Sequence, residues 1–370
     1  MKIAIVINTS WNIYNFRMGL IRALQKKGHQ IYAIAPPDDY SDYLVAGGCQ
    51  YWPIQMDNSG NHPIRDIILW VKLYQAYKNI QPDLILHYTI KPNIYGSLAA
   101  RLLGIKMINN VSGLGTVFIQ KGWVTTIAKY MYRWAFRFPQ KIFFQNRDDC
   151  DMFINQKLVR PEKAEIIPGS GINTRKYEPS PELVDRPFTF LLISRLLIEK
   201  GIVEYTEAIG ILLKKHIDAR FWLLGATEFE HKRGIKAVDL EKWENDGILQ
   251  YLGAVVDVRP IIEQADCVVL PSYREGLPKS LLEAASMEKP LIASDVPGCK
   301  EVVMDQINGL LCRVKDPDDL AAKMMQIYRM DENARKGMGQ KGRLLVTERF
   351  SEDLVIQKYL VTIDALIANL

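Results

Sequence analysis

Two glutamates, Glu275 and Glu283, stand eight residues apart in a setting suited to holding a charged ligand. The apolar run 267–271 predicts a buried strand before Glu275, and the apolar residues around Glu283 predict a helix. Glu275 is thus expected in a Gly/Pro loop at a strand's carboxyl end, and Glu283 in the first turns of a helix. Such a helix start attracts phosphate through its N–H groups and its dipole. An alternative interpretation is local, because Ser280 and Glu283 also match a capping box, in which Glu283 only bonds back to the helix start.

A second charged loop follows the apolar run 188–194 and carries Arg195, Lys200 and Gly201. An arginine can bind a diphosphate as a fork and a lysine as a point charge, and a glycine lets the backbone come close. An isolated Arg/Lys pair of this kind is more often a solvated loop. Its position upstream of the glutamate pair favours a diphosphate-binding role.

These two loops resemble the Glu-x7-Glu and Arg-x4-Lys-Gly motifs of family 4 retaining glycosyltransferases. The resemblance implies that Glu275 lies beside the donor sugar and that Glu283 holds the nucleotide ribose. It also implies that the cations of the earlier loop neutralise the donor diphosphate. Weaker matches over residues 167–311 add further donor-binding residues, namely Asn173, Gly253, Ala254, Gly276, Leu277 and Pro278.

The first half of the chain narrows this resemblance. Residues 16–20, 87–96 and 110–118 resemble bacterial transferases that build capsule, O-antigen or N-linked glycans on undecaprenyl diphosphate. The residues expected on the acceptor side are Asn12, Lys91, Asn93, Gly113 and Gly115. We interpret His87, at an expected strand end, as structural rather than as a catalytic base.

Length and composition indicate two globular domains. The chain has 370 residues, 48% of them hydrophobic and 24% charged. Short apolar runs alternate with amphipathic stretches, such as a helical run at 18–27 after an aromatic loop at 8–14. This alternation predicts α/β domains with parallel sheets covered by helices on both faces. Five widely spaced cysteines indicate reduced thiols rather than disulfides or zinc.

The resemblance implies the GT-B arrangement, in which two Rossmann-like domains face a central cleft. We expect an acceptor domain at residues 1–170, a linker at 171–187 and a nucleotide-sugar donor domain at 188–352. A C-terminal helix at 353–370 is expected to pack back toward the first domain.

Charge is distributed unevenly along the chain. Residues 1–150 contain 17 Lys and Arg against 8 Asp and no Glu, a net charge of +9 within a chain of +5. The stretch 122–144 interleaves Lys129, Arg133, Arg137 and Lys141 with aromatic residues. We interpret it as an interfacial helix for anionic lipid, the alternative being an aromatic core helix with a basic edge. No apolar run reaches membrane-spanning length, so the expected location is peripheral, on the cytoplasmic face of the cell membrane. No nucleic-acid-binding module is recognised.

The predicted activity is retaining transfer of a sugar, an N-acetylhexosamine from a UDP-sugar, to a polyprenyl-diphosphate-linked saccharide. No enzyme nucleophile, cofactor or essential metal is expected, because the Asp-x-Asp at Asp316 to Asp318 is interpreted as a helix cap. Two alternatives remain open, a hexosamine 2-epimerase on the same fold and a non-catalytic nucleotide-sugar-binding protein.

Overall fold

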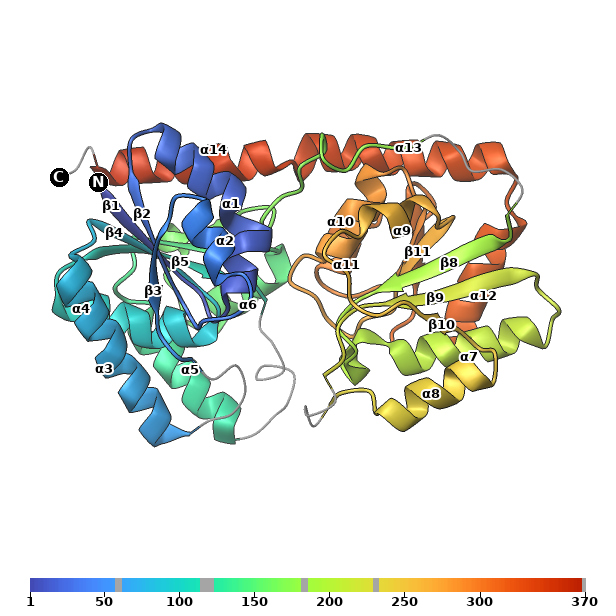
Figure 1. Ribbon diagram of the computed structural model, residues 1–370, viewed down its shortest axis with the longest axis horizontal. Helices are drawn as coiled ribbons and strands as arrows, with labels where there is room; N and C mark the ends of the chain where they lie inside the picture. Colours follow the sequence, from blue (N-terminus) through green and yellow to red (C-terminus); the bar gives the residue numbers. More distant parts are fainter. Residues whose placement is uncertain (57–61, 114–122, 181–185, 229–232, 368–370) are drawn as a thin grey trace. The chain divides into compact units, whose positions relative to one another are not determined.

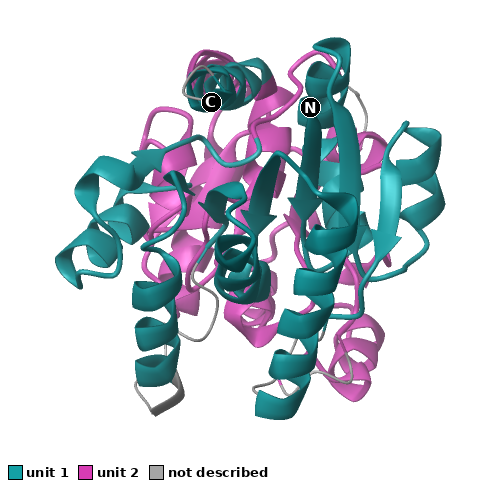
Figure 2. Ribbon diagram, turned by 90° about the vertical axis from the view of Figure 1, so that its left-hand side faces the viewer, with its two compact units in different colours: residues 1–170, 353–370 teal, residues 171–352 magenta. Residues whose placement is uncertain are grey.

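The computed structural model describes residues 1–370 apart from 57–61, 114–122, 181–185, 229–232 and 368–370. The chain forms two compact units, coloured separately in Figure 2. Unit 1 comprises Met1–Ser170 with Asp353–Leu370, and unit 2 comprises Gly171–Glu352. Each unit holds one parallel sheet, so the expected α/β class with two Rossmann-like domains is confirmed.

Unit 1 is built on a seven-stranded parallel sheet in the order β3-β2-β1-β4-β5-β6-β7. Its strands are β1 (Lys2–Val6), β2 (Gln30–Ala35), β3 (Gln50–Pro53), β4 (Leu84–Tyr88), β5 (Lys106–Val111), β6 (Lys141–Phe144) and β7 (Ala164–Ile166). The strand order reverses between β1 and β4. Ligands of such sheets bind at the carboxyl ends of the strands around this point.

The helices of unit 1 cover both faces of this sheet (Figure 1). They are α1 (Ser10–Lys26), α2 (Ser41–Ala46), α3 (Pro63–Ile80), the π-helix η1 (Pro92–Gly96), α4 (Ser97–Leu102), α5 (Trp123–Ala135), α6 (Arg147–Asn155), the short η3 (Pro161–Lys163) and α14 (Glu352–Ile367). Successive side chains of β1 point to opposite faces of the sheet, as in any β-strand. Ile3 and Ile5 pack with α1 and α14, whereas Ala4 and Val6 pack with α3 and α4.

Unit 2 repeats the plan with a six-stranded parallel sheet in the order β10-β9-β8-β11-β12-β13. Its strands are β8 (Phe188–Ile193), β9 (Ala219–Leu224), β10 (Gln250–Tyr251), β11 (Cys267–Leu270), β12 (Leu291–Ser294) and β13 (Gly309–Cys312). Its helices are η4 (Ile198–Lys200), α7 (Ile202–Leu213), α8 (Ala237–Asn245), α9 (Arg259–Glu263), α10 (Lys279–Ser286), α11 (Cys299–Val302), α12 (Pro317–Arg329) and α13 (Glu332–Arg349). As expected, Asp316 caps α12, its side chain accepting from the backbone N–H of Asp319.

Two expected elements differ from the structure. The aromatic loop at 8–14 is instead the start of α1, because the Thr9 side chain accepts from the Asn12 backbone N–H and caps a helix that begins at Ser10. The interfacial helix at 122–144 is also wrong in extent, since α5 ends at Ala135. A turn containing Pro139 follows, and residues 141–144 form the buried strand β6.

Candidate functional site

In unit 2 the loops that follow β8 and β11 are neighbours, because these strands pair in the sheet. The Tyr273 backbone N–H of the second loop donates to the Glu199 carbonyl of the first at 2.9 Å. Gly201 follows η4 with φ +74°, and a Cβ there would lie 2.1 Å from the Pro271 carbonyl oxygen. Both the backbone conformation and this approach require glycine, so the sequence at this point fixes the two loops against each other.

Lys200 and Glu275, one from each loop, form an ion pair with 2.6 Å between Nζ and Oε1. Their side chains are only 18% and 12% exposed. A cation and a carboxylate this poorly hydrated are costly to keep without close pairing. The pair places a cation and a hydrogen-bond-accepting carboxylate side by side at the carboxyl edge of the sheet.

Arg195, the other predicted diphosphate ligand, lies at the surface. Its side chain is 63% exposed and lies 3.4 Å from Glu228, a surface pair of small energetic weight. Within the described part of the chain, Arg195 makes no hydrogen bond or ion pair to Lys200 or Glu275. The structure therefore brings together two of the three predicted catalytic residues and leaves the third exposed in the same loop.

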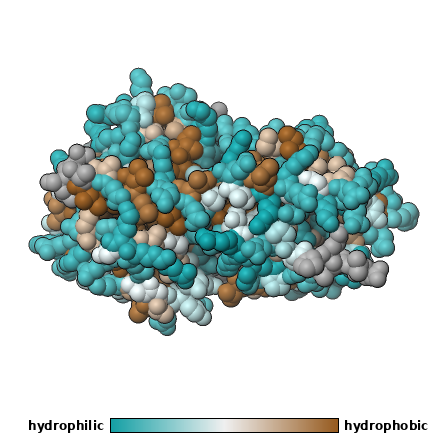
Figure 3. All heavy atoms as spheres, turned by 90° about the horizontal axis from the view of Figure 1, so that it is seen from above, coloured by the Kyte–Doolittle hydropathy of each residue, from teal (hydrophilic) through white to brown (hydrophobic). Residues whose placement is uncertain are grey.

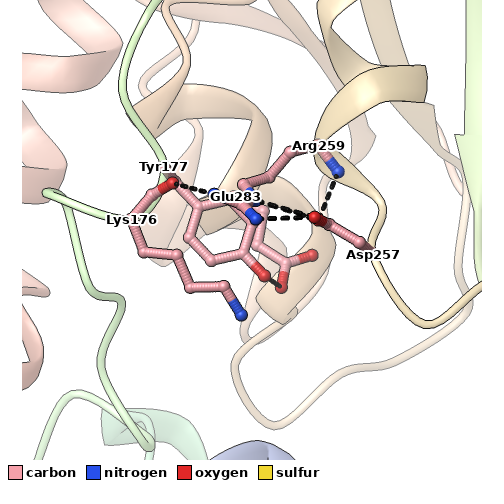
Figure 4. Close-up of polar contacts among 5 residues, drawn as sticks. All are labelled: Lys176, Tyr177, Asp257, Arg259 and Glu283. Carbon is pink, nitrogen blue, oxygen red and sulfur yellow. Dashed lines mark hydrogen bonds and ion pairs between the residues drawn. The ribbon is translucent and has the colours of Figure 1, made fainter.

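Glu283 is buried in the second turn of α10, and its Oε1 accepts a hydrogen bond of 2.8 Å from the Tyr177 hydroxyl (Figure 4). Lys279, one turn earlier, lies 3.8 Å from the same oxygen. Burial raises the pKa of Glu283 above its usual value, while the charge of Lys279 and the Tyr177 bond oppose that rise. The capping-box alternative is wrong, because Pro278 is the N-cap of α10 and no side chain caps it.

Tyr177 was missed by the sequence analysis, which placed residues 171–187 in a linker. Its ring is buried in a hydrophobic cluster of unit 2. Its backbone carbonyl accepts from the Ser286 hydroxyl at 2.6 Å and from Arg343 of α13 at 3.1 Å. Burial, followed by the charge of Glu283, raises the pKa of Tyr177, so the hydroxyl stays protonated as a donor. The carboxylate is thus held by a fixed side chain from a distant part of the chain.

A second ion pair supports the same segment. Arg259 binds Asp257 through three contacts of 2.6–3.1 Å and donates to the Lys176 carbonyl at 3.3 Å (Figure 4). The hydrogen bonds from Arg259 hold the pKa of Asp257 below its usual value. Asn173 closes the preceding turn, its Oδ1 accepting from the Lys176 backbone N–H at 2.9 Å. These contacts order the chain immediately before Tyr177.

The remaining predicted donor-side residues lie in the loops at the same edge. The Gly253 carbonyl, after β10, accepts from the backbone N–H of Gly225, after β9, at 2.8 Å, and Ala254 is exposed. Gly276, Leu277 and Pro278 connect the Lys200–Glu275 pair to the start of α10.

The predicted acceptor-side residues lie in unit 1 at the carboxyl ends of β1, β4 and β5. Asn12 is in the first turn of α1, and Gly113 follows β5 with φ +123°. The Lys91 ammonium pairs with the Asp66 carboxylate of α3 at 2.8 Å. Asn93 is buried and donates to the Asn110 carbonyl at 2.8 Å. The fifth predicted residue, Gly115, lies outside the described residues.

His87 is completely buried between the Tyr77 hydroxyl at 2.9 Å and the Asn109 Oδ1 at 3.0 Å. Burial lowers the pKa of His87 to about 4. A neutral imidazole with both nitrogens engaged in the core is a structural residue. The five cysteines are buried free thiols, and the described residues contain no group of three His, Cys, Asp or Glu able to hold a metal ion.

Comparison with known families assigns both halves of the chain. Residues 2–146 match the model described as glycosyl transferase 4-like, and residues 187–330 match the model described as glycosyl transferases group 1. These matches bear out the resemblance seen in the motifs.

Two curated relatives are transferases named for lipid-linked sugars. The N,N'-diacetylbacillosaminyl-diphospho-undecaprenol α-1,3-N-acetylgalactosaminyltransferase of Campylobacter jejuni is 29% identical over 100% of both chains. The UDP-Gal:α-D-GlcNAc-diphosphoundecaprenol α-1,3-galactosyltransferase of Escherichia coli is 25% identical over 71% of each chain. HepE of Anabaena, solved with UDP and glucose, superposes with a TM-score of 0.82 at 18% identity, covering 99% of this chain and 100% of that one. The expected GT-B fold is thereby confirmed, and neither the epimerase nor the sensor alternative gains support.

Proposed function

Since this chain belongs to the glycosyl transferase 4-like, group 1 glycosyltransferases, we propose that it moves a sugar from a UDP-sugar to a polyprenyl-diphosphate-linked saccharide. The transfer retains the anomeric configuration and serves cell-surface glycan assembly. The observation that carries the proposal is the Lys200–Glu275 pair at the carboxyl ends of β8 and β11. The names of the two bacterial relatives support the acceptor class, and that of the Campylobacter relative supports an N-acetylhexosamine as the sugar.

In this proposal the diphosphate of the donor binds Lys200 and Arg195. The low exposure of Lys200 strengthens its attraction for the negative charge that develops on the leaving diphosphate. The Arg195 side chain is 63% exposed and can turn toward the ligand without disturbing the core. Glu275 accepts hydrogen bonds from sugar hydroxyls and, by pairing with Lys200, keeps that cation in place.

The nucleoside is held by Glu283 and the loops beside it. Tyr177 occupies Oε1 of Glu283, so the other carboxylate oxygen is the one offered to a ribose hydroxyl. Gly253 and Ala254 lie against the base, and the backbone of residues 276–278 leads the phosphates to the start of α10. Asn173 acts indirectly, by closing the turn that precedes Tyr177.

The chemical step requires no protein nucleophile. The acceptor hydroxyl attacks on the face from which the diphosphate departs, and the diphosphate oxygen takes up the proton of that hydroxyl. Stabilisation of the departing diphosphate by fixed charges and backbone amides replaces a metal ion in this scheme, so no essential divalent metal is part of the proposal.

The acceptor binds unit 1, where the carboxyl ends of β1, β4 and β5 carry Asn12, Lys91, Asn93 and Gly113; Gly115, outside the described residues, belongs to the same proposal. None of the described helices combines the length and hydropathy needed to cross a bilayer. The net charge of +9 on residues 1–150 supports attachment to anionic lipid. We therefore place the protein peripherally, on the cytoplasmic face of the membrane.

Paired lysine and arginine variants test the donor site. Lys200→Met breaks the ion pair at the carboxyl ends of β8 and β11. Arg186→Met breaks a comparable pair, Arg186–Asp266 at 2.7 Å with side chains 18% and 26% exposed, at the opposite ends of the same strands. Transfer from radiolabelled UDP-sugars is measured for both, together with thermal stability.

We expect Lys200→Met to lose about 10²–10³-fold in kcat, the usual effect of removing one group that stabilises developing negative charge. Arg186→Met should lose stability but keep the rate of the wild type, and Glu275→Ala should abolish transfer. Equal rate losses in the two methionine variants, or full activity of Glu275→Ala, would contradict the assignment. Absence of turnover by the wild type with any UDP-sugar would remove the transferase proposal itself.

A further inference from the structure

Helix α3 carries apolar side chains on its outer as well as its inner side. Leu69 packs in the core, whereas Ile64, Ile67, Ile68 and Val71 are between 38% and 66% exposed. Their spacing of three, four and seven residues puts the four on one stripe of the helix. A surface helix ordinarily presents polar residues outward, so an uninterrupted aliphatic stripe marks a surface that binds something.

Helix α5 repeats the feature. Ile127, Tyr130 and Trp134 are between 49% and 68% exposed and lie on one side of the helix. On the other side, Tyr132 and Ala135 are buried in the core of unit 1. We call the exposed side chains Ile64, Ile67, Ile68 and Val71 of α3, with Ile127, Tyr130 and Trp134 of α5, the docking surface.

The two helices are joined through η1, and their N-terminal ends point to the same side of unit 1 in both Figures 1 and 2. The Tyr95 hydroxyl of η1 donates to Asp66 of α3 at 2.9 Å and lies 4.0 Å from the sulfur of Met131 in α5. A helix that follows a strand of a parallel sheet begins at the carboxyl edge of that sheet. The N-terminal ends of α3 and α5 therefore lie at the edge of unit 1 that carries the acceptor-side residues, and Asp66 ties α3 to one of them, Lys91.

The charges on these helices have one sign. The exposed charged side chains that the structure describes on α3 and α5 are Arg65, Lys72, Lys78 and Arg133. The acidic residue of α3, Asp66, is buried and paired, and residues 123–135 contain no acid. Two copies of such a surface would bring like charges together, which disfavours self-association. The combination of aliphatic and aromatic side chains with cations complements an anionic lipid surface.

We propose that the docking surface inserts into the headgroup and upper acyl region of an anionic bilayer, with α3 as the main apolar anchor. The inference rests on the proposed function for the identity of the partner. A polyprenyl-linked acceptor presents its saccharide at a membrane, so we assign lipid rather than protein as the partner of the docking surface. Lys91 and the acceptor-side edge then face the lipid from which that saccharide emerges. Figure 3 shows one face of the molecule from above, with hydrophobic side chains among the hydrophilic ones.

The test measures flotation of the full chain with vesicles of phosphatidylcholine, alone or mixed with phosphatidylglycerol, at low and high salt. The α3 variant combines Ile64→Gln, Ile67→Gln and Ile68→Gln, which keeps good helix formers in the helix. The matched control combines Leu354→Gln and Val361→Gln on α14, where the side chains are 45% and 64% exposed. A third variant, Lys129→Gln with Arg133→Gln, lowers the charge of α5.

High salt screens the attraction of the cations for lipid and leaves the apolar contribution. We expect the α3 variant to lose at least about tenfold in partitioning at high salt, because apolar area no longer leaves water. The control should change by less than about twofold, within the small effect of an ordinary surface substitution. The α5 variant should weaken binding at low salt and to the anionic vesicles only.

Three results would overturn the inference. One is unchanged flotation of the α3 variant, and another is an equal loss in the α14 control. The third is wild-type dimerisation in sedimentation without vesicles that the α3 variant abolishes, which would make a second copy the occupant. UDP-induced thermal stabilisation and transfer to a detergent-dispersed acceptor should persist in the α3 variant. If the wild type showed neither UDP-induced stabilisation nor transfer, the proposed function would be wrong. The vesicle-binding result would still decide whether the docking surface binds lipid.

Discussion

Replacing Tyr177 with phenylalanine removes a single hydroxyl and, with it, the hydrogen bond of 2.8 Å to the buried carboxylate of Glu283. The Lys279 ammonium, also a partner of that oxygen, lies 3.8 Å away. A hydrogen bond to a charged group contributes about 1.5–3 kcal/mol to the free energy of unfolding, against about 0.5–1.5 kcal/mol for a neutral one. Tyr205→Phe is the matched control, since its buried hydroxyl donates to the Phe190 carbonyl at 3.2 Å.

The loss in Tyr177→Phe should depend on pH. Burial already raises the pKa of Glu283, and the Tyr177 bond lowers it by favouring the charged form. Removing the bond raises the pKa of Glu283 in the folded state further. For a carboxyl with a raised folded pKa, stability falls as pH rises from the unfolded value, 4.5 for Glu283, through the folded one. The stability difference between the variant and the wild type should therefore be small below about pH 4.5. It should grow as the pH rises above that value, because the variant then loses stability more steeply than the wild type.

Thermal melts across this pH range measure the effect. The transition to follow is the one whose melting temperature UDP raises, because a ligand stabilises the unit that binds it. In a unit of this size each kcal/mol moves the melting temperature by about 2–4 °C. The calculated loss is thus about 3–12 °C at neutral pH, and the loss in Tyr205→Phe is smaller and independent of Glu283. UDP should also stabilise Tyr177→Phe less than the wild type. A shift equal to that of the control, with no pH dependence, would refute the role given to the Tyr177–Glu283 bond.

The other predictions concern the loop backbone and metal. A Cβ at Gly225 (φ +151°) would lie 1.7 Å from the Ser194 carbonyl oxygen, so Gly225→Ala should cost about 2–6 kcal/mol and displace the loop that carries Arg195. A Cβ at Gly253 would meet no atom within 4 Å, so Gly253→Ala should cost only the strain of φ +73°, about 1–2 kcal/mol. Equal melting temperatures of the two variants would contradict the packing argument. Transfer activity should survive EDTA, and loss restored by added magnesium or manganese would overturn the metal-free proposal.

The parts of the fold that follow from local pattern were predictable from the sequence. Strands β8 and β11 fill the apolar runs 188–194 and 267–271 to within one residue. The end of α5 was not foreseen, although Pro139 was a signal, because the aromatic residues on both sides of it look alike in a helical pattern and in a buried strand. Short strands such as β3 and β13 were missed for the same reason, since four residues carry little periodicity.

The candidate site shows the same division. Lys200 and Glu275 were named from their loops, and the structure pairs them. Tyr177 was not, because its partner Glu283 is 106 residues away and its own segment has no periodicity. The capping box predicted at Ser280 does not form, because α10 begins at Lys279 and Ser280 is already inside the helix. The N-cap position is Pro278, whose side chain cannot accept a hydrogen bond. A contact between distant segments leaves no mark in local sequence, whereas a loop glycine or a charged strand end does.

The last helix of the chain has a consequence for how the protein is made. Val355, Tyr359 and Ile363 of α14 complete the core of unit 1, and the Tyr359 hydroxyl accepts from Asn110 of β5 at 3.0 Å. On the ribosome, residues 1–170 emerge roughly 10–40 s before these residues at ordinary rates of synthesis. During that interval the nascent first domain exposes the apolar surface that α14 later covers, while the whole of unit 2 is translated. A stop codon ahead of Asp353 would therefore damage the domain encoded by codons 1–170, which lie far upstream.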